Sequence, residues 1–275
     1  MLYYLFDYLT AYYSGFDVFR YLTLRIILSA LTALTISLVI GPVIIRKLVD
    51  RKLYQSIRKD GPKSHITQKA DIPSMGGIII IISIVLSTIL WSDILNKNIW
   101  ILLFVILTFG GIGFYDDYNK FIYSSSDGIS GKSKLFFQIF FSGVVAAYIF
   151  VTSSTEMEIT LTAPFFKNFS LYLGIFFIPW VILVIAGSSN AVNLTDGLDG
   201  LATVPVILVA GGFAFISYGT GNVVFSIYFQ FPSIKGKGEG SIVLGALIGF
   251  CLGFLWFKEP PAKMFVGNTG ALPLV

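Results

Sequence analysis

The sequence predicts an all-α polytopic integral membrane protein with seven transmembrane helices and the start of an eighth. Of its 275 residues, 55% are hydrophobic and 12% are charged, whereas roughly 25% of an average soluble domain is charged. Its mean hydropathy is +0.82. Its apolar runs are long enough to cross a bilayer core of about 30 Å as helices, and they lack the alternation of lipid-facing strands. No linker or repeat divides residues 1–275, so we expect one membrane-embedded domain.

The predicted spans follow one another as apolar runs bounded by charged or turn-forming residues. Glycine and proline inside them, as at Gly41-Pro42 and Pro205, are tolerated because neighbouring helices can satisfy the freed backbone groups. The segment 156–162 alternates polar and apolar residues, which predicts a short hairpin between two spans. The seven runs are 22–45, 75–91, 98–115, 135–151, 171–187, 201–218 and 241–257.

The distribution of lysine and arginine predicts the orientation of these spans. The connections after spans one, three, five and seven carry thirteen of these residues, against five on the opposite side. Cytoplasmic connections are enriched in Lys and Arg, so the odd-numbered connections should be cytoplasmic and the N-terminus external. This bias accounts for the net charge of +4, so we expect no nucleic-acid partner. A single cysteine, Cys251, rules out a disulfide framework within the chain.

The most unusual stretch, residues 188–202, is polar although long apolar runs flank it. It contains Asn190, Asn193, Asp196 and Asp199. An apolar core has no use for two amides and two carboxylates, since each carboxylate needs a compensating partner when it loses water. The orientation places this stretch at the cytoplasmic face.

The other predicted cytoplasmic connections carry further polar groups. The connection 46–74, which contains Lys69 and Ser74, is the most basic. It could be a solvated anchor at the anionic leaflet or a clamp for an anionic substrate. Its histidine, His65, is the only one in the chain and is interpreted as a loop residue, not a metal ligand.

Adjacent carboxylates, Asp116 and Asp117, stand at the end of the third span. They could simply reach interfacial water, or they could hold a cation or a proton, because unpaired ionisable groups near the apolar region are costly. The glycines that precede Asp116 favour close helix packing over a nucleotide-binding loop. Lys134 starts the fourth span, within reach of whatever these carboxylates bind.

Carboxylates, amides and lysines at one membrane face indicate phosphoryl transfer. Oxygen ligands of this kind suit Mg²⁺, which commonly bridges substrate phosphates, and lysines supply point charges for phosphate oxygens. Catalysis of phosphoryl transfer is mostly positioning and charge neutralisation. The location at the interface indicates that one reactant is a lipid and the other a soluble cytoplasmic molecule.

Four motifs of the chain resemble the phospho-N-acetylmuramoyl-pentapeptide transferases, a bacterial family within the polyprenyl-phosphate N-acetylhexosamine-1-phosphate transferase superfamily. The resemblance runs from about residue 19 to the last residue. It implies transfer of phospho-N-acetylmuramoyl-pentapeptide from UDP-MurNAc-pentapeptide to undecaprenyl phosphate with Mg²⁺, giving lipid I and UMP in the inner (cytoplasmic) membrane of a bacterium. A homodimer is left open as the assembly. The motifs are NAVNLTDGLDGLA at 190–202, DDYNK at 116–120, GPKSH at 61–65 and PSMGG at 73–77.

The resemblance also implies a role for each matching residue. Asp116 and Asp117 correspond to the aspartate pair that acts on the lipid phosphate, and one of them would take its proton. A double displacement through an aspartyl-phosphate is the competing mechanism. The implied catalytic residues are Asp116, Asp117, Asp196, Lys134 and Lys120, the substrate-binding residues are Lys69, Ser74, Asn190, Asp199 and Phe265, and the metal ligands are Asn193 and Asn268.

Two features depart from the family pattern. Asn268 stands where the family usually has a metal-binding aspartate, so Mg²⁺ should bind more weakly unless another carboxylate compensates. The sequence stops at Val275, where an eighth span begins, and lacks the family's later histidine-rich loop. We therefore expect a C-terminally truncated version of a ten-helix fold that is inactive on its own.

Two other functions remain open from the sequence. A sister enzyme that transfers GlcNAc-1-phosphate to a polyprenyl phosphate would share the central motifs. An ion or proton transporter would also carry membrane acids, but it predicts polar groups near the bilayer midplane and on both sides. Here the polar groups gather at one face.

Overall fold

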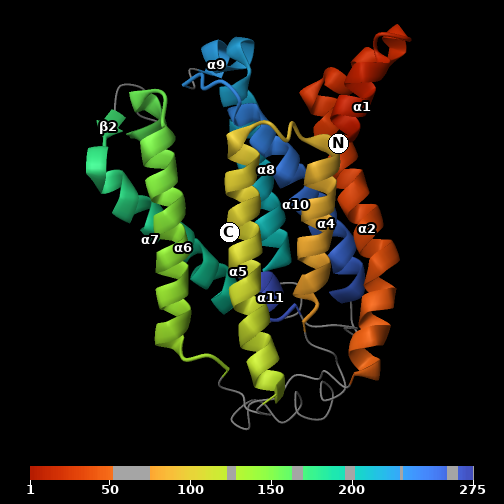
Figure 1. Cartoon of the computed structure of the whole chain (residues 1–275), viewed down its shortest axis with the longest axis vertical. Helices are drawn as coiled ribbons and strands as arrows, with labels where there is room; N and C mark the ends of the chain where they lie inside the picture. Colours follow the sequence, from red (N-terminus) through yellow and green to blue (C-terminus); the bar gives the residue numbers. More distant parts are fainter. Residues whose placement is uncertain are drawn as a thin grey trace.

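The computed structural model describes residues 1–51, 75–122, 128–162, 170–195, 202–229, 232–258 and 266–274. Its long helices run side by side, with short elements at the two ends of the bundle (Figure 1). The long helices are α2 (Leu22–Asp50), α4 (Gly77–Trp91), α5 (Lys97–Ile122), α6 (Gly131–Thr152), α7 (Phe177–Thr195), α8 (Thr203–Gly221) and α10 (Gly240–Lys258). The shorter α-helices and strands are α1 (Leu2–Leu9), α9 (Val223–Phe229), α11 (Asn268–Ala271), β1 (Thr160–Thr162) and β2 (Ser170–Tyr172), and the 3₁₀ turns are η1 (Ser14–Arg20), η2 (Glu156–Ile159), η3 (Gly174–Phe176) and η4 (Lys237–Glu239).

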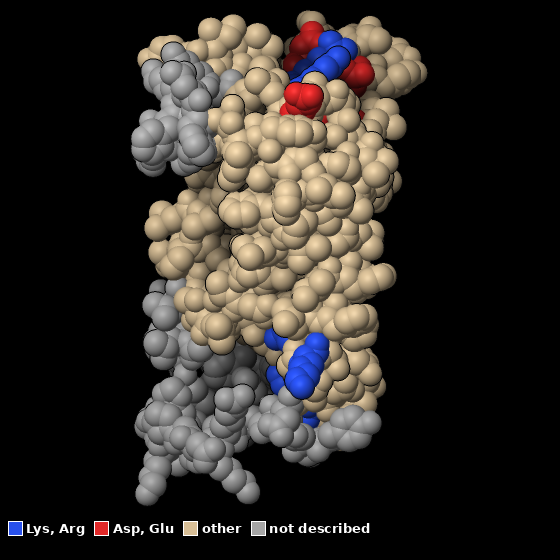
Figure 2. Space-filling model, turned by 90° about the vertical axis from the view of Figure 1, so that its left-hand side faces the viewer, with Lys and Arg blue, Asp and Glu red and all other residues tan. Residues whose placement is uncertain are grey.

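Each of the seven predicted spans corresponds to one long helix of the described structure, which confirms the all-α polytopic membrane fold. Six of these helices are long and apolar enough to cross a membrane. The exception, α4, has 15 residues and rises about 22 Å. Figure 2 shows charged side chains at the two ends of the molecule and none across the middle of the visible face. This distribution fits a bundle whose middle lies in the hydrocarbon core.

Both predicted boundaries of span five are wrong. Residues 171 and 172 belong to β2, which pairs antiparallel with β1 in the register Leu161 to Leu171. The predicted hairpin therefore exists, but it draws its second strand from residues assigned to the span. At the other end α7 continues to Thr195, so Asn190 and Asn193 lie on a helix and not in a connection.

The third span also continues beyond its predicted end. Helix α5 extends to Ile122, so Asp116 and Asp117 lie on the helix itself, more than one turn before its end. The next helix, α6, begins at Gly131, with the Ser130 side chain accepting a hydrogen bond from the backbone N–H of Ser133. Lys134 therefore lies in the first turns of α6, as predicted.

Small residues bring α2 and α10 into close contact. Glycines recur at every fourth position of α10, at 245, 249 and 253. A Cβ at Gly249 would overlap the backbone of Ala30, and one at Gly253 would overlap the Ser37 side chain. Spacing of small residues by four is the usual device for close helix packing in a membrane. The buried cluster beside this contact includes Phe250 and Phe254.

The one-turn helix α11 packs against α5 and α4 through two further glycines. A Cβ at Gly113 of α5 would overlap the backbone of Asn268, and a Cβ at Gly77 of α4 would overlap that of Gly270. The Gly77 N–H also donates to the carbonyl of Val266 at 3.0 Å. The prediction that glycines before Asp116 serve helix packing is thus confirmed for Gly113. We call this end of the bundle, where α5 ends and α6 begins, the α11 end.

The opposite end, which holds α1, η1, η4 and the hairpin, contains a buried ion pair. Arg25 donates from Nη2 to Oε1 of Glu239 at 2.6 Å and from Nη1 to Oε2 at 3.0 Å. The guanidinium carbon also lies 4.4 Å from the centre of the Tyr3 ring. Oε2 of Glu239 accepts the backbone N–H of Asp93 at 2.9 Å. This pair links α2, η4 and the turn after α4.

Candidate functional site

The adjacent carboxylates of α5 are both buried, with 2% of Asp116 and 7% of Asp117 exposed. Consecutive residues on an α-helix point about 100° apart. The two side chains therefore meet different neighbours, although both lie against α11.

Asp117 accepts its hydrogen bonds from the start of α11. Its Oδ2 accepts the backbone N–H of Thr269 at 2.8 Å and the hydroxyl of the same residue at 2.7 Å. Its Oδ1 accepts the backbone N–H of Asn268 at 3.2 Å. The first N–H groups of a helix have no partner inside it, and a carboxylate there also interacts favourably with the helix dipole. Asp117 therefore fixes α11 to α5.

Asp116 binds a different set of donors. Its Oδ2 accepts Nζ of Lys120 at 2.7 Å and also the side-chain Nδ2 of Asn268. Its Oδ1 accepts the backbone N–H of Ile129 at 2.7 Å. The chain reaches this position through Gly128, whose φ of +57° is in the left-handed region that favours glycine, and whose Cβ, if present, would overlap Oδ1 of Asp116.

Two lysines complete the charged cluster. Lys120 lies 3.8 Å from Oδ1 of Asp117 as well as 2.7 Å from Asp116. Lys134, from the first turns of α6, lies within electrostatic range of Asp116, Asp117 and Lys120. Within the described residues, no carboxylate forms an ion pair with Lys134. We call these four residues, Asp116, Asp117, Lys120 and Lys134, the Asp–Lys cluster, and its formal charge is zero.

The two described asparagines of the polar stretch lie on α7. Nδ2 of Asn190 donates to Oε1 of Gln138 on α6 at 2.8 Å and to the carbonyl of Ala186 at 2.8 Å. Asn193 follows one turn later and is half-buried. The structure thus ties α7 to α6 near Lys134 through an amide pair.

Several predicted site residues cannot be placed. Asn190, Asn193 and Asn268 have described positions, as do all four members of the Asp–Lys cluster. The positions of Lys69, Ser74, Asp196, Asp199 and Phe265 lie outside the described residues.

Two residues at the site were not predicted from the sequence. Thr269 supplies two of the donors to Asp117, and Gln138 is fully buried between α6 and α7. A glutamine within an apolar run, one turn from Lys134, was a usable signal for Gln138, because polar groups inside membrane helices are rarely accidental. Thr269 carried no such signal.

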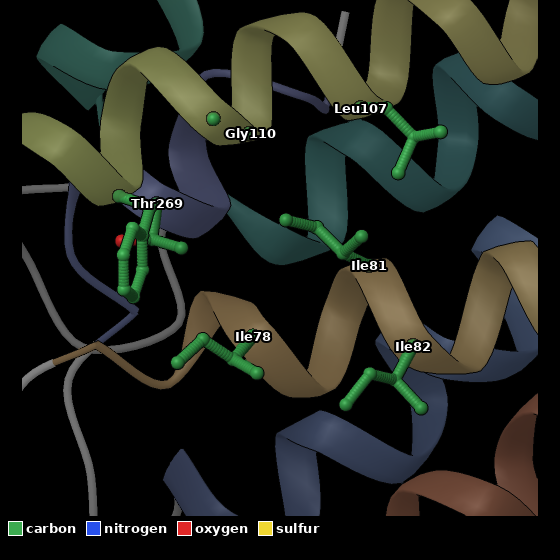
Figure 3. Close-up of a pocket in the computed structure, with 8 residues that line it drawn as sticks. Ile78, Ile81, Ile82, Leu107, Gly110 and Thr269 are labelled. Carbon is green, nitrogen blue, oxygen red and sulfur yellow. The ribbon is translucent and has the colours of Figure 1, made fainter.

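An apolar pocket of about 220 Å³ opens between α4 and α5 beside the start of α11. Figure 3 shows Ile78, Ile81 and Ile82 on α4 and Leu107 on α5, with Thr269 at the α11 end of the pocket. The lining is almost entirely apolar, so this pocket is suited to hydrocarbon and not to a phosphate.

The donor set at the α11 end is compatible with Mg²⁺. Carboxylate and amide oxygens are the ligands that Mg²⁺ takes, and Asp116 lies in hydrogen-bond contact with Asn268. Within the described residues no group of three or more His, Cys, Asp or Glu side chains could hold a metal. The residues that fit are therefore few, and substrate phosphates would have to supply the remaining ligands.

Comparisons with known proteins match the chain to two family models and to a curated relative, among others. The model of glycosyl transferase family 4 matches residues 99–275. Signature 1 of the phospho-N-acetylmuramoyl-pentapeptide-transferases matches residues 69–81. The phospho-N-acetylmuramoyl-pentapeptide-transferase of Pelagibacter ubique (strain HTCC1062) is 51% identical over 275 residues, which cover 100% of this chain and 76% of that relative.

Proposed function

The chain belongs to glycosyl transferase family 4 and, within it, to the phospho-N-acetylmuramoyl-pentapeptide-transferases, and from this premise we propose how its Asp–Lys cluster performs the reaction. The reaction transfers phospho-N-acetylmuramoyl-pentapeptide from UDP-MurNAc-pentapeptide to undecaprenyl phosphate. Its products are lipid I and UMP, and it is the first membrane step of peptidoglycan synthesis.

The observation that carries the proposal is the burial of two carboxylates against α11, paired with a lysine, at one end of an apolar bundle. Asp116, Asp117 and Lys120 make ion pairs or close contacts there. Burying ionisable groups at such a place costs free energy, so they are found there mainly where they serve a function. A lipid phosphate can reach this depth from the bilayer, while a nucleotide sugar can reach it from the aqueous side.

Lys120 and Lys134 are proposed to bind phosphate oxygens. Their ammonium groups are balanced by Asp116 and Asp117 in the described structure, and Lys134 makes no ion pair of its own there. An incoming phosphate can therefore take Lys134 as a partner without breaking an existing ion pair. Positioning and charge neutralisation of this kind account for most of the catalysis of phosphoryl transfer.

Asp116 is proposed to take the proton of the lipid phosphate. Two of its donors are the side chains of Lys120 and Asn268, which can rotate away, whereas Asp117 is held by two backbone N–H groups of α11. Asp117 is accordingly assigned to positioning α11. An oxygen of the lipid phosphate then attacks the sugar-linked phosphorus, the bond from that phosphorus to the oxygen of UMP breaks, and UMP leaves.

A double displacement is the second mechanism that the geometry allows. Here a carboxylate oxygen of Asp116 attacks the sugar-linked phosphorus and releases UMP, and the lipid phosphate displaces the carboxylate afterwards. Incubating the protein with labelled UDP-MurNAc-pentapeptide and no lipid acceptor distinguishes the two routes. A labelled protein that is chased by undecaprenyl phosphate supports the two-step route, and its absence supports direct attack.

Mg²⁺ is proposed as the cofactor, with Asn193, Asn268 and Asp116 as its candidate protein ligands. When bound, it would neutralise charge on the diphosphate and on the departing UMP. Because the Asp–Lys cluster has no formal charge, the site needs an additional positive charge to hold two phosphate-bearing substrates. The residues outside the described part, Lys69, Ser74, Asp196, Asp199 and Phe265, keep their proposed roles in binding the nucleotide sugar and in catalysis.

We also propose the membrane and the orientation. The excess of Lys and Arg in the connections at the α11 end favours a cytoplasmic position for that end in the bacterial inner membrane, with the N-terminus outside. UDP-linked substrates are cytoplasmic, so the same orientation gives them access to the site.

The test compares nucleotide sugars in the full-length protein in membranes. Addition of undecaprenyl phosphate should cause UMP release from UDP-MurNAc-pentapeptide and not from UDP-GlcNAc. Release from UDP-GlcNAc alone would assign the chain to the sister activity instead. Transport of ions across sealed vesicles without UMP release would contradict the proposal altogether.

A further inference from the structure

A directed chain of hydrogen bonds joins α6, α7 and α11 beside the proposed site. Nδ2 of Asn190 donates to Oε1 of Gln138 at 2.8 Å, and Nε2 of Gln138 donates to the hydroxyl of Ser189 at 3.4 Å. That hydroxyl donates in turn to the carbonyl of Leu272 at 3.0 Å. Each group is thus a donor to the next, an arrangement in which hydrogen bonds strengthen one another.

The residue at the centre of this chain, Gln138, is completely buried, as is Ser189. A buried amide inside a membrane helix costs free energy unless it is hydrogen-bonded. The neighbours of Gln138 explain its amide group. Its side chain accepts a hydrogen bond from Asn190 and donates one to Ser189. The amide of Gln138 offers a separate acceptor and donor, and both are used across this gap.

The chain determines how Asn190 presents its remaining polar atom. Both bonds that Nδ2 makes, to Gln138 and to the carbonyl of Ala186, fix the orientation of the amide. In the described part of the protein, Oδ1 of Asn190 accepts no hydrogen bond and is left available. Asn190 is one of the residues proposed to bind substrate.

Helix geometry places this chain one turn from the Asp–Lys cluster. Helices α6 and α7 run in opposite directions, so one turn toward the α11 end leads from Gln138 to Lys134 and from Asn190 to Asn193. These steps of four and three residues are about 6 Å and 4.5 Å. Lys134 and Asn193 therefore lie at a similar position along the bundle. The hydrogen bond between Asn190 and Gln138, one turn farther from the α11 end, fixes the spacing of α6 and α7 there.

The same chain holds the second end of α11. Asp117 binds the first N–H groups of this helix, while Ser189 binds the carbonyl of Leu272, the residue that follows its last turn. Asn268, which touches Asp116, belongs to the first of these two attachments. The position of Asn268 thus depends on α7 as well as on α5.

We propose that Gln138 is a positioning residue for the transferase site. It touches no reacting atom, but it orients Asn190 toward the nucleotide sugar and, through Ser189, keeps α11 in place beside Asp116. This role rests on the function proposed above, since it presumes that Asn190 and the Asp–Lys cluster bind the substrates.

The test measures KM and kcat for UDP-MurNAc-pentapeptide in full-length variants. Gln138→Leu should raise KM about tenfold, the lower range for residues that orient a functional group. Gln138→Glu, kept neutral by its burial in the membrane helix, has one oxygen that accepts from Asn190 and a hydroxyl that can donate to Ser189, so its KM should stay within about threefold of the wild-type value. Ser142→Ala is the matched control, because Ser142 lies one turn farther from the site and, among the described residues, its hydroxyl bonds only to the carbonyl of Gln138 in its own helix.

A double-mutant cycle separates positioning from loss of stability. If Gln138 acts through Asn190, then Asn190→Ala should raise KM little further when Gln138→Leu is already present, because the oriented amide is lost in both cases. Independent, multiplying effects on KM would overturn the proposal. If Gln138→Leu does not accumulate in membranes, Gln138→Met enters the same cycle, because it fills a similar volume without the amide.

The outcomes also separate this inference from the proposed function. An active wild-type protein in which Gln138→Leu and Ser142→Ala have the same KM and kcat overturns the positioning role alone. A wild-type protein that neither binds nor consumes the nucleotide sugar overturns the proposed function and the positioning role together.

Discussion

Asn268 bridges the two carboxylates of α5, because its side-chain Nδ2 donates to Asp116 and its backbone N–H donates to Asp117. The family resemblance implies an aspartate at this position. An aspartate side chain accepts hydrogen bonds but donates none when ionised. The asparagine therefore does two things at once, since it supplies a donor to Asp116 and keeps the formal charge around the Asp–Lys cluster at zero.

Asn268→Asp should make the protein more dependent on divalent metal. The substitution removes a hydrogen bond to a charged group, which contributes about 1.5–3 kcal/mol, and places two carboxylates side by side. We expect a lower melting temperature without Mg²⁺, a larger rise on adding Mg²⁺ than in the wild type, and half-maximal activity at a lower Mg²⁺ concentration. Tryptophan fluorescence during heating measures the first two.

The matched control for this change is Asn119→Asp. Asn119 lies on α5, two residues after Asp117, and makes no described hydrogen bond to either carboxylate. Its replacement adds the same charge as Asn268→Asp and removes no described hydrogen bond from Asp116. Equal stabilisation of the wild type, Asn268→Asp and Asn119→Asp by Mg²⁺ would show that residue 268 is not part of a metal site.

Thr269→Val should weaken the attachment of α11 to α5. The change removes the hydroxyl that donates to Oδ2 of Asp117 at 2.7 Å and leaves the two backbone donors in place. A misplaced functional group commonly costs about 10-fold or more in rate, so we expect kcat to fall by about that factor. Thr269→Ser keeps the hydroxyl and should stay close to wild type. Equal kcat values in the two variants would contradict the role assigned to this hydroxyl.

Lys134→Gln should raise KM for the nucleotide sugar by about tenfold or more, since hydrogen bonds to charged groups contribute about 1.5–3 kcal/mol. The chain offers a close control in Lys132, which is exposed in the same first turns of α6. Lys132→Gln should leave KM nearly unchanged. Steady-state kinetics of UMP release would show this contrast, and similar KM values for both variants would indicate that Lys134 does not bind phosphate.

Arg25→Met should destabilise the protein without changing its catalytic constants. The arginine and Glu239 have only 6% and 13% of their side chains exposed, and breaking a buried pair typically costs about 3–5 kcal/mol. The pair lies at the end of the bundle opposite the site, so KM and kcat of the folded fraction should not change. Chemical unfolding in detergent measures the loss.

The control for the buried pair is Arg20→Met. Arg20 pairs with Asp7 at 2.7 Å, but 54% of its side chain is exposed, and solvent screens such pairs. Its replacement should leave the unfolding midpoint almost unchanged. A comparable loss in both variants would mean that burial does not set the contribution of the Arg25 pair.

The sequence was sufficient to predict the number and order of the long helices, because each is an apolar run that hydropathy detects directly. It was not sufficient at the ends of span five. Residues 171 and 172 are apolar enough for a span, yet they pair with β1 across the hairpin. Local hydropathy cannot detect such pairing, nor the continuation of α7 through Asn190 and Asn193, whose side chains favour turns.

The gathering of Asp116, Lys120 and Asn268 was also predicted, since their motifs were assigned to one membrane face. The partners of Asp117 were not predictable in the same way. Thr269 is separated from it by 152 positions, and no local pattern links a threonine at the start of a one-turn helix to a distant carboxylate. Gln138 was identified only from its contacts with Ser189 and Asn190.

The central claim is that the Asp–Lys cluster carries phosphoryl transfer to a membrane lipid. The most direct measurement follows UMP and lipid-linked product from UDP-MurNAc-pentapeptide on addition of undecaprenyl phosphate, in the full-length wild type and in Asp116→Asn. The account predicts equal amounts of the two products from the wild type and neither from the variant, because a side-chain amide cannot take the proton of the lipid phosphate. Undiminished release by a folded Asp116→Asn protein would contradict it.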